Sequence, residues 1–466
     1  MVAAPSPAIA ARIEFSIISP LGGAQTEVSA PSINGGVVTY LSTAAGDLPP
    51  FPPPMPIYTR VMAAEAATGA SQLVAQAGVT PMPAGGGAPF LGFLGVPSVD
   101  GGRVAFVGTG QMPDGSERTG IYIATPVFGG AGYTVAALAD TATPAPRGSG
   151  TFTQFNPPFM ADGEVVFSGL DGAGNEGIYR ARVPTSGNPP DVTLVANMNT
   201  PVPGNTGTFY GLSTYPTISN GVVAFNGAST APGPTNQGIF VADASGIIAV
   251  RADRTSFGPP GSDTSYGFSP TISAGNLAFS ARTAPAFGGP YTGQLYYVPA
   301  AGGGVEINGP LPDMWPALDL GLLAYGGQAG SPDPAIYTTL GQPAGVPVAV
   351  PVKLVGLGDL LGETGLAYYG YSPFLPDGYL GPIFHQGVDY ESNAVVFRAL
   401  VGPPGWDPTS GPPDVPINQA IIVARVIPEP SGGALVLTML ALFAPAAAFG
   451  RRQVLHQRTR GPTNVV

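Results

Sequence analysis

A ten-residue phrase recurs along the chain, and this repeat limits the possible folds more than any other feature. It consists of Pro, a small or hydroxyl residue, an apolar residue, a turn with Gly, and a short apolar run that ends in an aromatic. Such internal repetition indicates an architecture in which each copy is one structural unit. The copies, two of them degenerate, cover residues 31–40, 97–106, 158–167, 216–225, 270–279, 316–325 and 387–397.

Each copy is followed by two further short apolar runs. The second phrase is clearest at residues 120–124, 177–181 and 238–242, and the third at 135–139, 192–196 and 247–251. These runs are rich in β-branched and aromatic residues and are bounded by turn residues, which predicts β-strands. The Ala-rich run 61–68 is the stretch that could instead form a turn of helix.

About four strands per repeat, repeated about seven times, predict an all-β fold, and a β-propeller in particular. A solenoid is the alternative, and the ends of the chain discriminate between the two. The last repeat lacks a third strand after residues 421–426, whereas residues 12–18 form a strand without a repeat of its own. We therefore expect residues 12–18 to supply the outer strand of the last blade, which closes the ring and leaves no long open edge.

Composition excludes several kinds of chemistry. The net charge of −11 would repel phosphate backbones, so no nucleic-acid partner is expected. The chain has no Cys, which excludes disulfides, thiolate catalysis and Cys-ligated metals. With two histidines, His385 and His456, it also offers little for a His-based catalytic or metal site. We expect no cofactor and no metal.

Acidic residues are the remaining candidates for a site. Asp171–Glu176 and Asp114–Glu117 could suggest calcium, but their spacing follows no known calcium loop, and hairpin turns are expected at both places. Asp100, Asp162 and Asp319 lie in the turns of the first phrase, at equivalent places in different blades. This repetition favours a structural role and a non-catalytic binding or structural platform. The alternative is a glycan hydrolase or lyase that uses a pair of carboxylates at the propeller mouth.

The end of the chain differs from the rest. Residues 431–450 contain no charged residue, and a helix of that length would be about 30 Å long, enough to cross a bilayer. Arg451 and Arg452 follow directly and suit the cytoplasmic end of a stop-transfer segment. The sequence therefore predicts a hydrophobic C-terminal helix that spans a membrane.

The order Pro428-Glu429-Pro430, apolar span, Arg451-Arg452 resembles the PEP-CTERM sorting signal. This resemblance implies a Gram-negative-type bacterium with an exosortase, a membrane-embedded transpeptidase that removes the signal at the Pro-Glu-Pro region. It also implies an inner-membrane intermediate, and a mature protein at the cell surface or in an exopolysaccharide or biofilm matrix. The logic parallels that of a GPI signal, whose hydrophobic tail is also removed.

Export requires a leader peptide, and residues 1–11 resemble the end of one. Ala8 and Ala10 fit a small-x-small cleavage site, so we expect the true start codon to lie upstream. The predicted layout is a leader remnant at 1–11, a propeller at 12–427, a sorting signal at 428–452 and a basic cytoplasmic tail at 453–466.

Overall fold

The computed structural model divides the chain into two compact units, Ile13–Ile427 and Met1–Arg12 together with Pro428–Val466. The first unit contains all seven copies of the repeat. The structure describes residues 11–18, 27–43, 57–83, 86–129, 132–183, 190–231, 236–253, 256, 263–266, 270–284, 292–307, 316–319, 322–326, 335–338, 352–356, 367–368, 388–391, 394–402 and 418–428.

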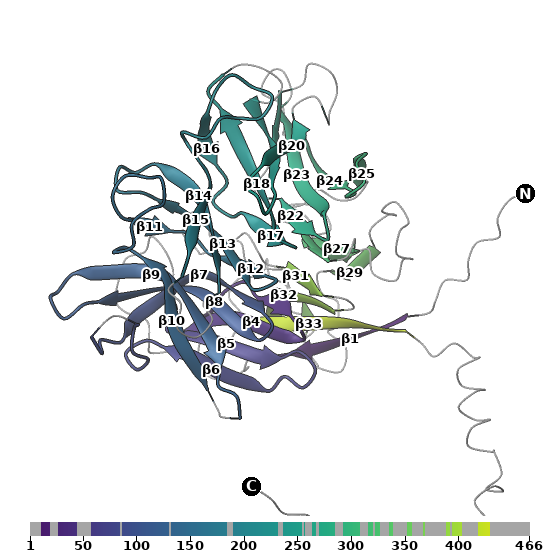
Figure 1. The fold of residues 1–466 in the computed structure, drawn as a ribbon. Coiled ribbons are helices and arrows are strands. Elements are labelled where there is room, and N and C mark those ends of the chain that lie inside the picture. Colours follow the sequence, from purple (N-terminus) through teal and green to yellow (C-terminus); the bar gives the residue numbers. More distant parts are fainter. Residues whose placement is uncertain are drawn as a thin grey trace, which may run out of the picture. The chain divides into compact units, whose positions relative to one another are not determined.

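Within these residues the strands form seven small antiparallel sheets arranged in a ring, which confirms the predicted seven-bladed β-propeller. Figure 1 shows the blades around the place where β12, β17, β22 and β31 meet. The strands of the first phrase contact one another in a closed cycle, in the order β3, β7, β12, β17, β22, β26, β31 and again β3. These strands therefore surround the axis of the propeller.

The blades are numbered along the chain. Blade 1 contains β2 (Glu27–Val28), β3 (Ser32–Asn34), β4 (Val37–Thr43), β5 (Arg60–Glu65) and β6 (Ser71–Gln76). Blade 2 contains β7 (Phe90–Asp100), β8 (Arg103–Gln111), β9 (Glu117–Pro126) and β10 (Tyr133–Asp140). Blade 3 contains β11 (Gln154–Phe155), β12 (Phe159–Ala161), β13 (Glu164–Leu170), β14 (Glu176–Arg182) and β15 (Val192–Asn197).

The other four blades follow the same plan. Blade 4 contains β16 (Phe209–Leu212), β17 (Thr217–Ser219), β18 (Val222–Ser229), β19 (Gln237–Ala242) and β20 (Ile248–Asp253). Blade 5 contains β21 (Asp263–Tyr266), β22 (Thr271–Ser273), β23 (Asn276–Ala284), β24 (Thr292–Val298) and β25 (Val305–Ile307). Blade 6 contains β26 (Ala317–Asp319), β27 (Leu322–Gly326), β28 (Ala335–Thr338) and β29 (Val352–Gly356). Blade 7 contains β30 (Ala367–Tyr368), β31 (Val388–Glu391), β32 (Ala394–Gly402), β33 (Asn418–Pro428) and β1 (Ala11–Ile17).

The N-terminal strand closes the ring, as the sequence predicts. β1 is the outer strand of blade 7, in the order β1-β33-β32-β30, and the Ile18 amide donates to the Ile421 carbonyl oxygen at 3.1 Å. Phe15 and Ile17 pack against the hydrophobic core of the last two blades. The first and last segments of the propeller are thus joined in one sheet.

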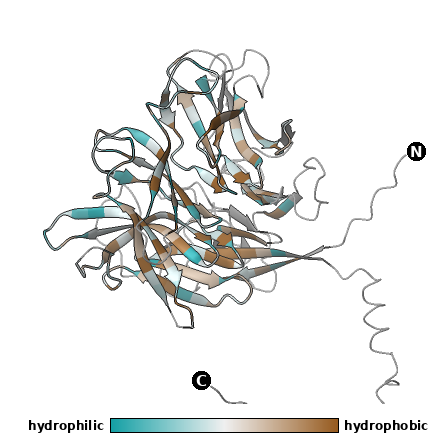
Figure 2. Ribbon diagram, viewed as in Figure 1, coloured by the Kyte–Doolittle hydropathy of each residue, from teal (hydrophilic) through white to brown (hydrophobic). Residues whose placement is uncertain are grey.

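A cross-strand aromatic pair forms the centre of five blades. The last residue of the first phrase stacks on the aromatic of the second phrase, with ring centroids 5.5–6.0 Å apart. Tyr122, Tyr179 and Phe240 are buried, so these second-phrase aromatics pack in the cores of their blades. Hydrophobic residues accordingly run along the strands (Figure 2). The pairs are Phe106–Tyr122, Phe167–Tyr179, Phe225–Phe240, Phe279–Tyr296 and Tyr325–Tyr337.

The Ala-rich run 61–68 forms a turn only at its end, residues 66–68, where the Gly69 amide donates to the Glu65 carbonyl oxygen at 2.8 Å. Most of it lies in β5, which pairs with β4 and β6 in blade 1. Ala63, Ala64 and Ala66 are all buried. Strand pairing on both sides overrides the helical preference of Ala, because local propensity is weaker than tertiary context.

Candidate functional site

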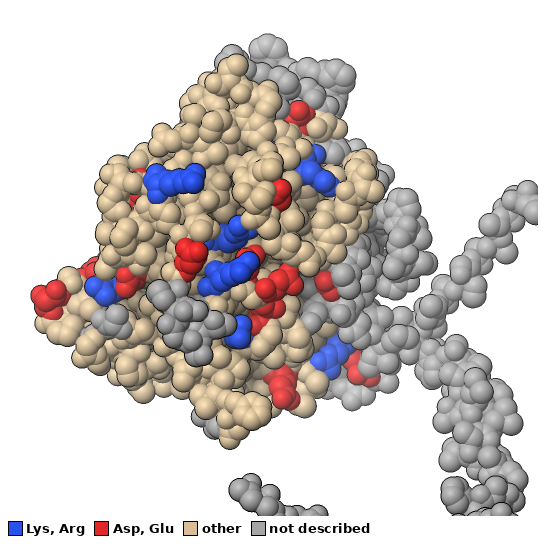
Figure 3. Space-filling view, in the orientation of Figure 1, with Lys and Arg blue, Asp and Glu red and all other residues tan. Residues whose placement is uncertain are grey.

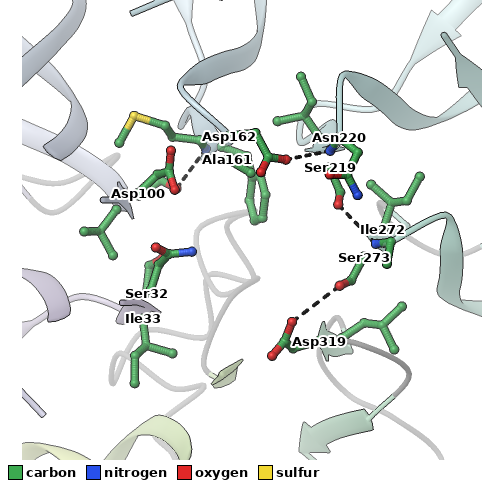
Figure 4. A pocket seen from close by; sticks show the side chains of 18 residues that line it. Ser32, Ile33, Asp100, Ala161, Asp162, Ser219, Asn220, Ile272, Ser273 and Asp319 are labelled. Atoms are coloured by element: carbon green, nitrogen blue, oxygen red, sulfur yellow. Dashed lines mark hydrogen bonds between the residues drawn. The ribbon is translucent and has the colours of Figure 1, made fainter. Parts of the chain in front are cut away.

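The strands around the axis enclose a pocket of about 350 Å³ (Figure 4). Its lining comes from the first-phrase strands and turns of blades 1 to 6. A volume of this size falls in the range of small-molecule sites. The lining residues are Ser32, Ile33, Asn34, Ser98, Val99, Asp100, Phe159, Met160, Ala161, Asp162, Ile218, Ser219, Asn220, Ile272, Ser273, Ala274, Leu318 and Asp319.

Tight two-residue turns place the polar residues of this pocket. In blades 1 to 5 the described turns have positive φ at both central residues, for example 55° at Asp162 and 73° at Gly163. This is the geometry of a type I′ hairpin turn, which favours Gly, Asn and Asp. This geometry therefore explains the repeated Gly of the first phrase, and also Asp162 and Asn220.

Hydrogen bonds at these turns connect blades 1 to 6 in series. Asp100 Oδ2 accepts from the Gly163 amide at 2.7 Å, and Asp162 Oδ2 accepts from the Asn220 amide at 2.6 Å. Figure 4 shows both bonds. Three further contacts continue the series. They are Gly101 N to Asn34 Oδ1 at 3.3 Å, Ala274 N to Ser219 Oγ at 3.1 Å, and Ser273 Oγ to Asp319 Oδ1 at 3.5 Å.

The structure thus brings Asp100, Asp162 and Asp319 into one pocket, but their positions are not all equivalent. Asp100 and Asp319 are the last strand residues before the turn, opposite Arg103 and Leu322. Asp162 lies one residue later, as the first residue of the turn itself, because Ala161 is the residue opposite Glu164. The looser copy of the phrase in blade 3 accounts for this shift.

The two stretches considered for calcium are hairpin turns. Asp171 is buried, and its carboxylate accepts hydrogen bonds from the amides of Ser149, Ala173 and Asn175 at 2.8–2.9 Å. Asp114 is exposed and accepts from the amide and hydroxyl of Ser116 at 2.9 and 2.6 Å. Within the described residues, no group of three or more His, Cys, Asp or Glu side chains is placed to hold a metal ion.

Asp171 should contribute to stability in a pH-dependent way. Burial raises the pKa of its carboxyl, but the hydrogen bonds from Ser149, Asn175 and Ala173 outweigh burial, and the net pKa is lowered. A lowered folded-state pKa means that stabilisation is present above the unfolded pKa of about 3.9 and is lost as the pH falls through the folded value. We expect Asp171→Asn to cost about 1–3 kcal/mol at pH 7 and progressively less below about pH 4.

Urea unfolding of both proteins between pH 7 and pH 3 measures this difference. Asp114→Asn is the control, because Asp114 lies in the corresponding hairpin turn of blade 2, two positions further along, where it is exposed and should show a smaller cost at pH 7. A cost for Asp171→Asn that does not change with pH would contradict the assignment.

Glu176 is a carboxyl whose environment sequence reasoning missed. Burial raises its pKa, partly offset by the Leu212 amide, which donates to Oε2 at 3.1 Å from the neighbouring blade. The sequence shows Glu176 only as the residue after a hairpin turn. The contact with Leu212 depends on how blades 3 and 4 pack, which no local pattern reveals.

Most residues of the predicted sorting signal lie outside the described part of the chain. Pro428 is the last residue of β33. Glu429, Pro430, Arg451 and Arg452 lie outside it, as do Ala8, Ala10, His385 and the predicted C-terminal helix at 431–450. Among the helices of the described residues, none has the length and apolar character needed to cross a membrane. Figure 3 shows Lys, Arg, Asp and Glu side chains gathered over the middle of one face, with both signs of charge close together.

Comparison with known proteins adds a partial family match. Residues 59–254 match a family of unknown function (DUF7453), and this segment covers the second half of blade 1 and all of blades 2 to 4. No curated protein matches the chain.

Several solved structures are similar to this chain at low identity. A polysaccharide lyase, Uly1, is 8% identical with a TM-score of 0.46, covering 85% of this chain and 89% of its own. An acylaminoacyl peptidase of Pyrococcus horikoshii is 9% identical with a TM-score of 0.43, covering 81% and 49%. A protein of unknown function from Dyadobacter fermentans is 9% identical with a TM-score of 0.38, covering 91% and 100%.

Proposed function

We propose that this chain is an exported bacterial surface or extracellular-matrix protein whose propeller is a non-catalytic binding and structural platform. The observation that carries this proposal is the use of the pocket carboxylates. Asp100 and Asp162 each hold a backbone amide of the next blade at 2.7 and 2.6 Å. Carboxylates fixed in this way hold the blades together, whereas glycoside hydrolysis needs a pair free to act on a substrate as acid and as base or nucleophile.

The proposed cellular location of the protein rests on its C-terminal segment. Pro428-Glu429-Pro430, the apolar span at 431–450 and Arg451-Arg452 support processing by an exosortase after transient membrane insertion. The platform would then remain at the surface or in the matrix, with exopolysaccharide as a partner. The low content of charged residues, 10% of the whole chain, suits contact with uncharged polymers.

The test follows the full chain, with an epitope tag, in a bacterium that has an exosortase and in the same strain without it. We expect the propeller outside the cell and shortened near Pro428–Pro430 only in the first strain. The recovered propeller should retain exopolysaccharide in a pull-down without shortening the polymer.

Glu429→Ala is the matched variant for the sorting step, and it should leave the protein in the membrane fraction. Identical location and mass in both strains would refute the proposed address. Polymer cleavage that disappears in Asp100→Asn or Asp162→Asn would refute the platform and favour a glycan-active enzyme.

A further inference from the structure

The charged residues that line the axial pocket are all acidic. Its lining includes Asp100, Asp162 and Asp319, and no Lys, Arg or His lies among the described residues that form it. The turns around the axis therefore concentrate negative charge from three blades.

Some carboxylate oxygens in the pocket accept no hydrogen bond from the described part of the protein. Asp100 and Asp162 each bind a neighbouring amide through Oδ2. Within the described residues, Oδ1 of each has no hydrogen-bond donor. A carboxylate is an acceptor with about four lone-pair sites, so both can take a further donor.

A hydroxyl group in blade 1 gives independent evidence that the pocket takes a ligand. Ser32 lines the pocket with 6% of its surface exposed, and its hydroxyl has no partner among the described residues. Ser98, Thr217 and Thr271 hold the same register position in other blades, and all three are bonded to the next blade. The orphan hydroxyl of blade 1 is thus an exception to a regular pattern.

The residue opposite Ser32 strengthens this point. Thr39 pairs with Ser32 across the sheet, is fully buried, and its hydroxyl has no partner in the described structure. The corresponding residues of blades 2 to 6 are all apolar. Buried polar groups without partners are rare in native proteins, and an unseen water, ion or ligand is one explanation. Those apolar residues are Ala105, Val166, Ala224, Ala278 and Ala324.

Apolar residues alternate with the polar ones along these strands. The third residue of each phrase in blades 1 to 6 is 1–6% exposed and packs in the hydrophobic cores of the blades, so the pocket itself presents mainly polar groups. These residues are Ile33, Val99, Met160, Ile218, Ile272 and Leu318.

We propose that the axial pocket binds an organic ammonium ion of the linear polyamine class. Ammonium groups are donors without acceptors and carry the charge opposite to that of Asp100 and Asp162. A linear polyamine carries several such groups, and the pocket holds carboxylates from three blades. A neutral sugar would fill the acceptors but leave the negative charge uncompensated. This inference rests on the proposed function, because it gives the binding platform a specific ligand.

Titration calorimetry of the purified full chain with spermidine tests the proposal. We expect saturable binding at low salt, and an affinity at least about tenfold lower in the double variant Asp100→Asn/Asp162→Asn. Asparagine keeps an acceptor for each inter-blade bond. It also occurs naturally at these two places, as Asn34 in blade 1 and Asn220 in blade 4. The double variant should therefore fold.

Asp114→Asn is the matched control, since it removes one charge from an exposed turn outside the pocket and should keep the wild-type affinity. If the double variant has a lowered melting temperature, the single variants Asp100→Asn, Asp162→Asn and Ser32→Ala are measured in its place. Each of them should lose less affinity for spermidine than the double variant. Absence of saturable binding, or equal binding by the double variant, overturns the proposal. Tighter binding of glucose or of Ca²⁺ than of spermidine does so as well. None of these results alters cellular location or polymer cleavage, which decide the proposed function separately.

Discussion

Removal of residues 1–18 is expected to lower the melting temperature of the propeller by at least about 5 °C. These residues contain β1, the outer strand of blade 7. Without it, the long strand β33 (Asn418–Pro428) becomes an open edge with unpaired amide and carbonyl groups. The deletion also removes Phe15, Ile17 and Ile18 from the cores they pack against. Burial of three such side chains is worth about 5 kcal/mol.

The truncated propeller should still fold, because other contacts join its two ends. β3 of blade 1 contacts β31 of blade 7 at the axis. Arg398 in β32 donates to the Val28 carbonyl oxygen of β2 at 3.1 Å. We therefore expect a lowered melting temperature and a tendency to associate through the exposed edge, and not a loss of secondary structure.

Thermal unfolding followed by circular dichroism measures this effect. Removal of residues 1–10 is the control, because it leaves β1 intact and should preserve the wild-type melting temperature. If both deletions melt at the same temperature, β1 is not needed for closure and the propeller is better described as an open array.

The architecture was largely predictable because it depends on local signals that repeat. Each first phrase contains its own turn: Asp162-Gly163 and Asn220-Gly221 are residue pairs that favour a type I′ hairpin wherever they stand. The strand without a repeat at residues 12–18 then leaves one position unfilled, and the structure places β1 in that position.

The site was less predictable because it is made between blades. The sequence identifies Asp100 and Asp162 as turn residues, but their bonds to Gly163 and Asn220 depend on how one blade is rotated against the next. In the same way, Ser32 looks like every other hydroxyl of the first phrase. Only the packing of blade 1 against blade 2 leaves it without a partner.

The glycine of the second phrase leads to the other large effect. Gly238 opens the apolar part of β19 and lies beside a register shift in the pairing of β19 with β20. A Cβ atom at this position would lie 2.5 Å from the Ala252 carbonyl oxygen, and Gly120 has the same close contact with the Ala139 carbonyl oxygen in blade 2. The glycine is therefore required by the close approach of the neighbouring strand.

Gly238→Ala should accordingly destabilise the propeller by about 2–4 kcal/mol, because the atom that must move is backbone and not the end of a flexible side chain. Gly211→Ala is the matched control in the same blade, since a Cβ there meets nothing within 4 Å. The control should stay within about 0.5 kcal/mol of wild type. Urea unfolding of the two variants compares them directly. Equal midpoints would show that β20 can move aside at little cost, and that the second-phrase glycine is not set by strand spacing.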